Sequence, residues 1–125
     1  MARPRRSSST TPHDEAPKAQ QITWGKHIST ARGPEAILAL LENHGHRFDA
    51  RNLATAAHRL GKFGRMQRDR RFQLLADMCR RRTSDFHPQA IANTVWGFAK
   101  MDFVDRQLFD ALAVEAPRRI GEFKS

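Results

Sequence analysis

The chain has 125 residues, of which 39% are hydrophobic and 28% charged, and its formal net charge is +9. This composition is that of a globular chain with room for one modest core, and no apolar run approaches the roughly 20 residues that cross a bilayer, so no membrane partner is expected. The single cysteine, Cys79, excludes an intramolecular disulfide and a zinc cage built from thiolates, and its place on an apolar helix stripe predicts a core position.

Residues 1–20 are predicted to be a disordered tail. They contain Arg3, Arg5 and Arg6, a Ser/Thr run, and no aliphatic residue larger than Ala after Met1. Such a segment buries too little apolar surface to offset the entropy lost on ordering. Arginine and serine before the first acid are compatible with an organelle transit peptide, although the amphipathic face of such peptides is missing. The alternatives are a plain flexible tail and a basic arm that touches RNA.

Residues 21–47 are predicted to cap the N-terminal side of a helical array. Hydrophobic residues at near-helical spacing include Trp24, which is expected to pack as a cap, with stacking on a base as the alternative. A helix is predicted from Pro34 to Asn43, with Gly45 as the residue that ends it. Residues 34–47 therefore correspond to half of a repeat, in the position of a capping element.

A first helix occurs twice, in Phe48–Lys62 and, 38 residues later, in Phe86–Lys100. Self-similarity of this period is typical of repeat proteins. Asp49 and His87 are the predicted N-caps, and the proline after His87 sits at N1, where its missing N–H costs nothing. The apolar positions expected to face the core are Leu53, Ala54, Ala57 and Leu60 in one copy, and Ile91, Ala92, Val95, Phe98 and Ala99 in the other.

A second helix follows in each copy, from Asp69 to Arg82 and from Asp105 to Ala116, so the repeating unit is a helical hairpin of 37–38 residues. Residues 48–85 and 86–122 are the two predicted repeats, and residues 123–125 are predicted to open a truncated third. The predicted fold class is all-α, an α-solenoid of stacked hairpins. The core residues expected from the second helices are Phe72, Leu75, Met78 and Cys79, then Leu108, Phe109, Leu112, Ala113 and Ala116.

The run FHPQAIANTVWGFAK, followed by a second helix of the type LFDALAVEAPRRI, resembles the octotricopeptide repeats of algal and protist organelle proteins, which are similar to the helical region of FAST kinase-like and RAP-domain proteins. The resemblance covers about residues 34–125. The sequence departs from the family at Pro117, inside the last helix, and contains no RAP-like domain. The matching residues are Phe86, Pro88, Gln89, Ala92, Asn93, Thr94, Trp96, Phe98, Ala99, Lys100, Leu108, Leu112, Arg118 and Arg119.

This resemblance implies an RNA-binding α-solenoid of mitochondria or chloroplasts. Such a protein would act in the processing, stability or translation of organelle transcripts. Its expected partners are single-stranded RNA and other RNA-processing or ribosomal proteins.

The faces of the two first helices opposite their apolar stripes are predicted to line one RNA-binding surface. Thr55 and Asn93 hold equivalent places there, where small polar side chains can hydrogen-bond base edges. For Asn93 the alternative is a bond to the backbone of a neighbouring repeat, and Gly97 leaves room either for a stacked base or for close helix packing. His58 replaces Trp96 in the alignment and is expected at a contact between repeats. The predicted RNA-binding residues are Asn52, Thr55, Arg59, Lys62, Gln89, Asn93 and Lys100, with Arg65, Arg68 and Arg71.

Positive charge is concentrated in residues 48–85, which hold ten Lys or Arg against four acidic residues, a net of +6. A basic patch of that kind attracts phosphate by Coulomb attraction and counterion release. For any one arginine the alternative is a solvated helix face. Two repeats would hold about two bases, so we expect binding at micromolar or poorer affinity and little affinity for duplex.

Catalysis is not expected. The sequence has no Gly-rich phosphate loop, no Ser/His/Asp or Cys/His arrangement and no paired carboxylates at a predicted cleft. Asp105 is more simply an N-cap, and the His44 and His46 pair lacks a third metal ligand in register. We therefore expect no cofactor and no small-molecule substrate. The competing hypothesis is an α-solenoid scaffold for protein partners, with its arginines facing an acidic protein or solvent.

Overall fold

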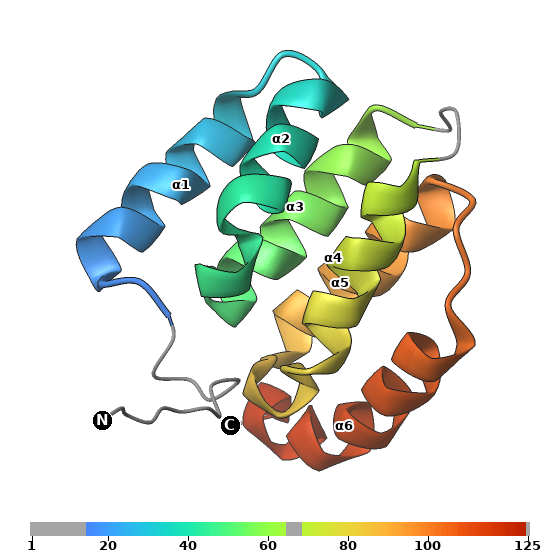
Figure 1. The fold of residues 1–125 in the computed structure, drawn as a ribbon. Helices are drawn as coiled ribbons and strands as arrows, with labels where there is room; N and C mark the ends of the chain where they lie inside the picture. Colours follow the sequence, from blue (N-terminus) through green and yellow to red (C-terminus); the bar gives the residue numbers. More distant parts are fainter. Residues whose placement is uncertain (1–14, 65–68, 125) are drawn as a thin grey trace, which may run out of the picture.

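A computed structural model describes residues 15–64 and 69–124, with side chains as far as Pro117. Within these residues every regular element is helical, which confirms the all-α prediction, and no helix combines the length and the apolar character needed to cross a membrane. The elements are α1 (Lys18–Thr30), α2 (Pro34–His44), the 3-10 turn η2 (Gly45–Arg47), α3 (Ala50–Lys62), α4 (Arg70–Arg80), the 3-10 turn η3 (Thr83–Asp85), α5 (Pro88–Lys100) and α6 (Arg106–Lys124), as Figure 1 shows.

The helices pair as three hairpins, and alternate helices also touch. α3 contacts α1 on one side and α5 on the other, while α4 contacts both α2 and α6 (Figure 1). The odd-numbered helices therefore form one layer and the even-numbered helices a second, with the core between them. Because α3 has a neighbour on both sides, it is the most deeply packed helix of its layer.

The N-terminal segment is a complete hairpin, which differs from the half repeat predicted in residues 34–47. α1 has 13 residues, as many as α3 and α5. It begins at Lys18, inside the predicted tail, and the N–H of Ala16 donates to the carbonyl of Arg47 at 3.0 Å. The sequence indicates helical spacing around Trp24 but not where this helix begins, because its first turn carries no large apolar side chain. The first 14 residues of the tail predicted in residues 1–20 lie outside the described residues.

Trp24 is buried at the junction of the first two hairpins. Its ring lies 5.3 Å from that of His44 and 5.1 Å from that of Phe48, and it is 5% exposed. The packing interpretation of Trp24 is therefore confirmed over base stacking. His44 is exposed and stacks on this ring.

Gln21 and Asn52 join α1 to α3 through buried hydrogen bonds. The Asn52 amide donates to the backbone carbonyl of Gln21 at 2.8 Å and to its Oε1 at 3.0 Å. The Gln21 amide in turn donates to the carbonyl of Arg47 at 2.7 Å. Asn52 is only 3% exposed. Its predicted place on the RNA-binding surface is therefore wrong, because α1 covers that side of α3.

α3 and α5 approach at backbone contact. A Cβ added at Gly97 would lie 2.1 Å from the carbonyl oxygen of Ala57, and one at Gly61 would lie 2.7 Å from Cα of Gly97. Glycine inside a helix costs about 0.5–1 kcal/mol relative to alanine, so this close packing has to offset that cost. Of the two interpretations of Gly97, the structure supports close helix packing.

The predicted apolar stripe is confirmed in α3 and partly wrong in α5. Leu53, Ala54, Ala57 and Leu60 are all buried. In α5, Ile91 and Phe98 are buried, whereas Thr94 and Gly97 face inward where Ala92, Val95 and Ala99 were expected. The two helices differ because α3 is covered by helices on both sides, while α5 has α3 on one side only among the described helices of its layer.

The second helices supply the other half of the core. Phe72, Leu75, Met78 and Cys79 are buried as predicted, and burial raises the pKa of the Cys79 thiol, which keeps it protonated and unreactive. In α6, Leu108 and Leu112 are buried, Phe109 and Ala116 are half-buried, and Ala113 is exposed. The Asp105 carboxylate accepts from the N–H of Leu108 at 2.9 Å, which confirms it as an N-cap.

α6 runs on past its predicted end at Ala116. It contains Pro117 and continues to Lys124. A proline removes one backbone hydrogen bond from a helix without necessarily ending it. Phe123 therefore lies inside α6, and the prediction that it opens a new repeat is wrong.

Thr94 gives a stability prediction. It is fully buried in α5, and its Oγ1 has no hydrogen-bond partner among the described residues. Thr94→Val keeps the shape and removes the unpaired hydroxyl, so we expect unfolding in urea to require about 1 kcal/mol more free energy. Thr23→Val, at an exposed position whose hydroxyl donates to the carbonyl of Ala19, is the matched control. A less stable Thr94→Val variant would mean that this hydroxyl is satisfied in solution.

Candidate nucleic-acid interface

Two rows of side chains on α3 and α5 match each other position by position. All are exposed or half-exposed, and each residue of one row lies 38 residues from its counterpart in the other. α1 carries a third row at the same helix positions, formed by Ala19, Thr23, Lys26 and Thr30, all exposed. We call the α3 and α5 rows together the α3–α5 ridge; it consists of Arg51, Thr55, His58 and Lys62 with Gln89, Asn93, Trp96 and Lys100.

An open cavity of about 340 Å³ lies between the first turns of the two helices. Thr55 and Asn93 both line it, so the two residues predicted to be equivalent share one environment. The Thr55 hydroxyl donates to the carbonyl of Arg51 at 2.8 Å, and the Gln89 amide donates to Oδ1 of Asn93 at 3.1 Å. The Asn93 amide nitrogen is thereby presented as a donor. The lining residues are Ala50, Arg51, Ala54, Thr55, Asp85, His87, Gln89, Ala90 and Asn93.

An aromatic pair occupies the middle of the ridge. The rings of His58 and Trp96 lie 4.8 Å apart with their planes inclined by 36°, which confirms that His58 sits at a contact between the two hairpins. Burial, together with the charges of Lys62 and Arg59, lowers the pKa of His58 below its usual value. The imidazole is therefore neutral near neutral pH. Trp96 remains 39% exposed.

The far end of the ridge carries two exposed lysines, one from each helix. Lys100 places its Nζ 5.6 Å from the centre of the Trp96 ring, a cation–π contact. Lys62 is its counterpart on α3. A cavity with polar side chains in its wall, an aromatic pair and two cations thus follow one another along the ridge. Polar side chains, aromatic rings and cations are the three kinds of group that contact base edges, base faces and phosphates.

Arg59 lies off this ridge, contrary to the prediction. Its Nη2 donates to the carbonyl of Ala31 at 2.8 Å, at the end of α1, and its guanidinium lies 5.3 Å from the centre of the Phe63 ring. The residue is half-buried on the side of α3 that faces α1. It therefore joins two helices and is not presented to a ligand.

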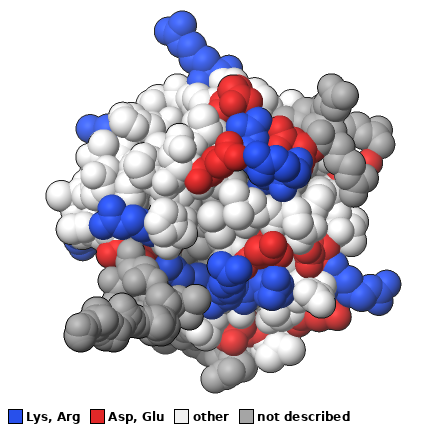
Figure 2. All heavy atoms as spheres, in the orientation of Figure 1, with Lys and Arg blue, Asp and Glu red and all other residues white. Residues whose placement is uncertain are grey.

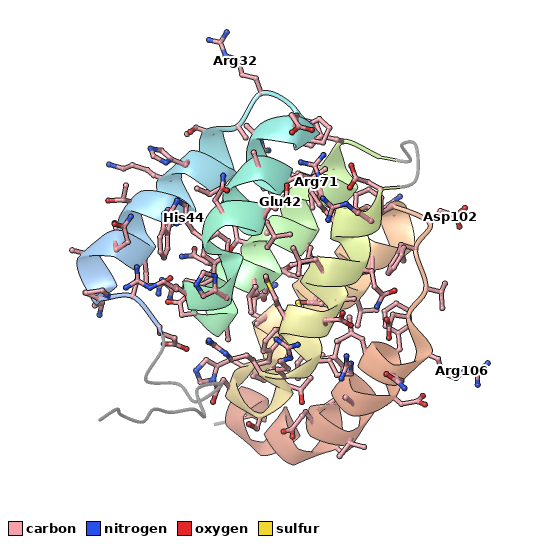
Figure 3. The ribbon with its side chains drawn as sticks, in the orientation of Figure 1. Arg32, Glu42, His44, Arg71, Asp102 and Arg106 are labelled. Carbon is pink, nitrogen blue, oxygen red and sulfur yellow. The ribbon has the colours of Figure 1, made fainter. Side chains whose placement is uncertain are left out.

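Arg71 is likewise engaged within the protein. It donates to Glu35 Oε1 and to Asp69 Oδ2, both at 2.8 Å, and its side chain is only 15% exposed. Glu42 of α2 lies beside it, with a carboxylate oxygen 3.8 Å away (Figure 3). The cluster joins α2 to the start of α4. Arg71 is therefore not available to bind phosphate, contrary to the prediction.

Other arginines of residues 48–85 are also paired with acidic side chains. Arg70 bonds Glu42 at 2.9 Å, and Arg80 bonds Asp77 at the same distance. Arg82 contacts Glu15 and donates to the carbonyl of Phe48 at 2.9 Å. Figure 2 shows several places on the visible face where Lys and Arg side chains lie beside Asp and Glu, and other Lys and Arg side chains that stand apart. The net of +6 therefore does not form one open patch on that face; Arg65 and Arg68 lie outside the described residues.

The hydrogen bonds between Asp69 and Arg71 make part of the protein's stability depend on pH. The bonds from Arg71 lower the pKa of the Asp69 carboxyl to about 2. Because the folded pKa lies below the unfolded value near 3.8, the stabilisation is complete above pH 4 and is lost as the pH falls towards 2. Asp69→Asn keeps an N-cap and removes the charge, so we expect it to cost about 1 kcal/mol at pH 7 and progressively less as the pH falls to 2, where the native carboxyl is half protonated. Thermal melts across this range test it, with Asp110→Asn as an exposed control. A difference that does not change with pH would contradict it.

Three members of the ridge, namely Arg51, His58 and Trp96, are not among the RNA-binding residues predicted from the sequence. The signal that finds them is the 38-residue offset read together with helical spacing, which places Arg51 opposite Gln89 and His58 opposite Trp96. Within the described residues no three His, Cys, Asp or Glu side chains gather as metal ligands. No protein-family model, curated protein or solved structure matches this chain.

Proposed function

We propose that the protein binds single-stranded RNA along the α3–α5 ridge, as an α-helical repeat protein that acts in the processing, stability or translation of organelle RNA. The observation that carries this proposal is the match between the two rows, in which Thr55, His58 and Lys62 on α3 have Asn93, Trp96 and Lys100 as counterparts on α5. Repeated side chains on a repeated helix suit a repeated ligand, and a single strand of nucleic acid is one.

The arrangement of the hairpins supports an α-solenoid. The residue before each N-cap is buried in all three hairpins: Ala16, Phe48 and Phe86. Three further positions are buried in every first helix, namely Gln21, Trp24 and Ile28 in α1, Leu53, Ala56 and Leu60 in α3, and Ile91, Thr94 and Phe98 in α5. One packing scheme thus serves three successive units, which is the defining property of stacked repeats. The resemblance to octotricopeptide repeats points the same way.

Physical chemistry limits how tightly the ridge can bind. Each base contact contributes about 1–3 kcal/mol, and two or three units offer only a few such contacts. Lys62 and Lys100 are exposed, so their attraction for phosphate is screened by salt. We therefore expect micromolar affinity that falls as salt rises.

Titration of a fluorescently labelled single-stranded RNA octamer, with unlabelled duplex as competitor, tests this function. The expected result is a micromolar dissociation constant and little competition by duplex, because paired bases cannot enter the cavity or reach Trp96. Absence of binding at high micromolar protein would reject RNA binding for this chain. The scaffold for protein partners would then be the better explanation of the exposed ridge.

A further inference from the structure

We propose that Trp96 is a stacking platform that receives the face of one unpaired base, while Lys100 moves from the Trp96 ring to the neighbouring phosphate. The inference rests on the proposed function and names the contact that would give it affinity. It assigns a role to the exposed ring of Trp96.

The two tryptophans of the chain differ in their exposure and in the residues that they contact. Trp24 is 5% exposed and packs against Phe48, as a core residue does. Trp96 is 39% exposed, and its ring lies 4.8 Å from that of the half-buried His58 and 5.6 Å from the ammonium of Lys100. A large apolar ring kept at the surface between polar groups is the arrangement that proteins use to stack single-stranded bases.

The neighbours of Trp96 prepare it for such a contact. His58 comes from α3, is half-buried and rests against the Trp96 ring at 4.8 Å, which holds the ring on the ridge. Lys100 is one turn further along α5 and exposed, with its ammonium 5.6 Å from the ring centre. An exposed cation–π contact is weaker than a base–aromatic stack, so a base displaces the ammonium favourably. The displaced ammonium then pairs with phosphate.

The platform has a defined ligand class. Every base has a π face, so stacking on Trp96 tolerates any sequence, but it requires a base that is free of its partner strand. The next base of the RNA strand then lies towards Thr55 and Asn93, whose hydroxyl and amide groups contact base edges. We therefore expect the cavity to give the protein its preference for particular RNA sequences. Trp96 is expected to give affinity for single strands of any sequence.

Fluorescence of the full chain tests the platform directly. The probes are an oligouridine octamer and an abasic octamer with the same number of phosphates. Stacking is expected to quench the exposed Trp96 when oligouridine is added, with much weaker binding and no quenching for the abasic strand. Trp96→Ala is expected to weaken oligouridine binding about tenfold or more, the fold-change of one lost stack, and Trp96→Phe to recover part of it. Circular dichroism melts check that each variant keeps its fold.

The outcomes separate this inference from the proposed function. If the wild type binds oligouridine and the Trp96→Ala variant binds it equally well, without quenching in the wild type, the platform is rejected and RNA binding stands. Equal binding of the abasic strand likewise rejects the platform. If the wild type binds neither strand, both the platform and the RNA-binding function are rejected.

Discussion

The Gly97→Ala variant is expected to lose about 3 kcal/mol of stability, at the upper end of what an added methyl group costs in a packed interior. The new Cβ would lie 2.1 Å from the carbonyl oxygen of Ala57 and 2.4 Å from its carbonyl carbon. Both atoms belong to the backbone of α3, so no side-chain rotation relieves the clash and the two helices have to separate. Alanine is the better helix former by about 1 kcal/mol, so propensity alone predicts the opposite sign.

Urea unfolding followed by circular dichroism measures this loss. Gly33→Ala is the control, because a Cβ there meets nothing within 4 Å and the backbone is extended, with φ −158°. We expect that change to cost less than about 1 kcal/mol, through the weaker N-cap. A Gly97→Ala variant as stable as the wild type would show that α3 and α5 do not need their backbone contact.

Reversing the charge of the two ridge lysines, Lys62 and Lys100, is expected to have the largest effect on RNA binding. The Lys62→Glu and Lys100→Glu double variant replaces two cations beside the aromatic pair with two anions, which repel phosphate. We expect at least a tenfold loss of affinity for the RNA octamer at low salt, shrinking as salt is added. Both side chains are exposed, so the fold should be unaffected.

A matched double variant removes the effect of net charge. Arg32 and Arg106 are exposed and point away from the body of the protein (Figure 3). Reversing both to glutamate changes the total charge by the same amount as the lysine pair. We expect this control to bind RNA within about threefold of the wild type, because separated surface charges are screened. If both double variants lost affinity equally, overall charge and not the ridge would be responsible.

The parts of the fold that the sequence predicts are those with local signals. Asp49 and Asp105 accept bonds from the backbone N–H three residues later, as their place before an apolar run indicates. The 38-residue offset paired Thr55 with Asn93, and both line one cavity. That pairing needs only helical spacing and the stacking of like units, and both are visible in one chain.

The parts that could not be predicted depend on partners far away in the sequence. Asn52 and Arg59 lie on the correct helix, but on the side that α1 covers, and the polar first turn of α1 gave no sign of a helix there. Arg71 bonds Glu35, 36 residues away, which no local pattern encodes. A charged residue counted as part of a basic patch can therefore be committed to an ion pair between helices.

The most direct test of the account is a titration of the ¹⁵N-labelled protein with single-stranded RNA, followed by amide chemical shifts. We expect the largest changes along the outer faces of α3 and α5, at Thr55, His58 and Lys62 and at Asn93, Trp96 and Lys100. The indole N–H signal of Trp96 should shift and that of Trp24 should not. Shifts centred on α2 and α4, or none at saturating RNA, would contradict the claim that the α3–α5 ridge is where RNA binds.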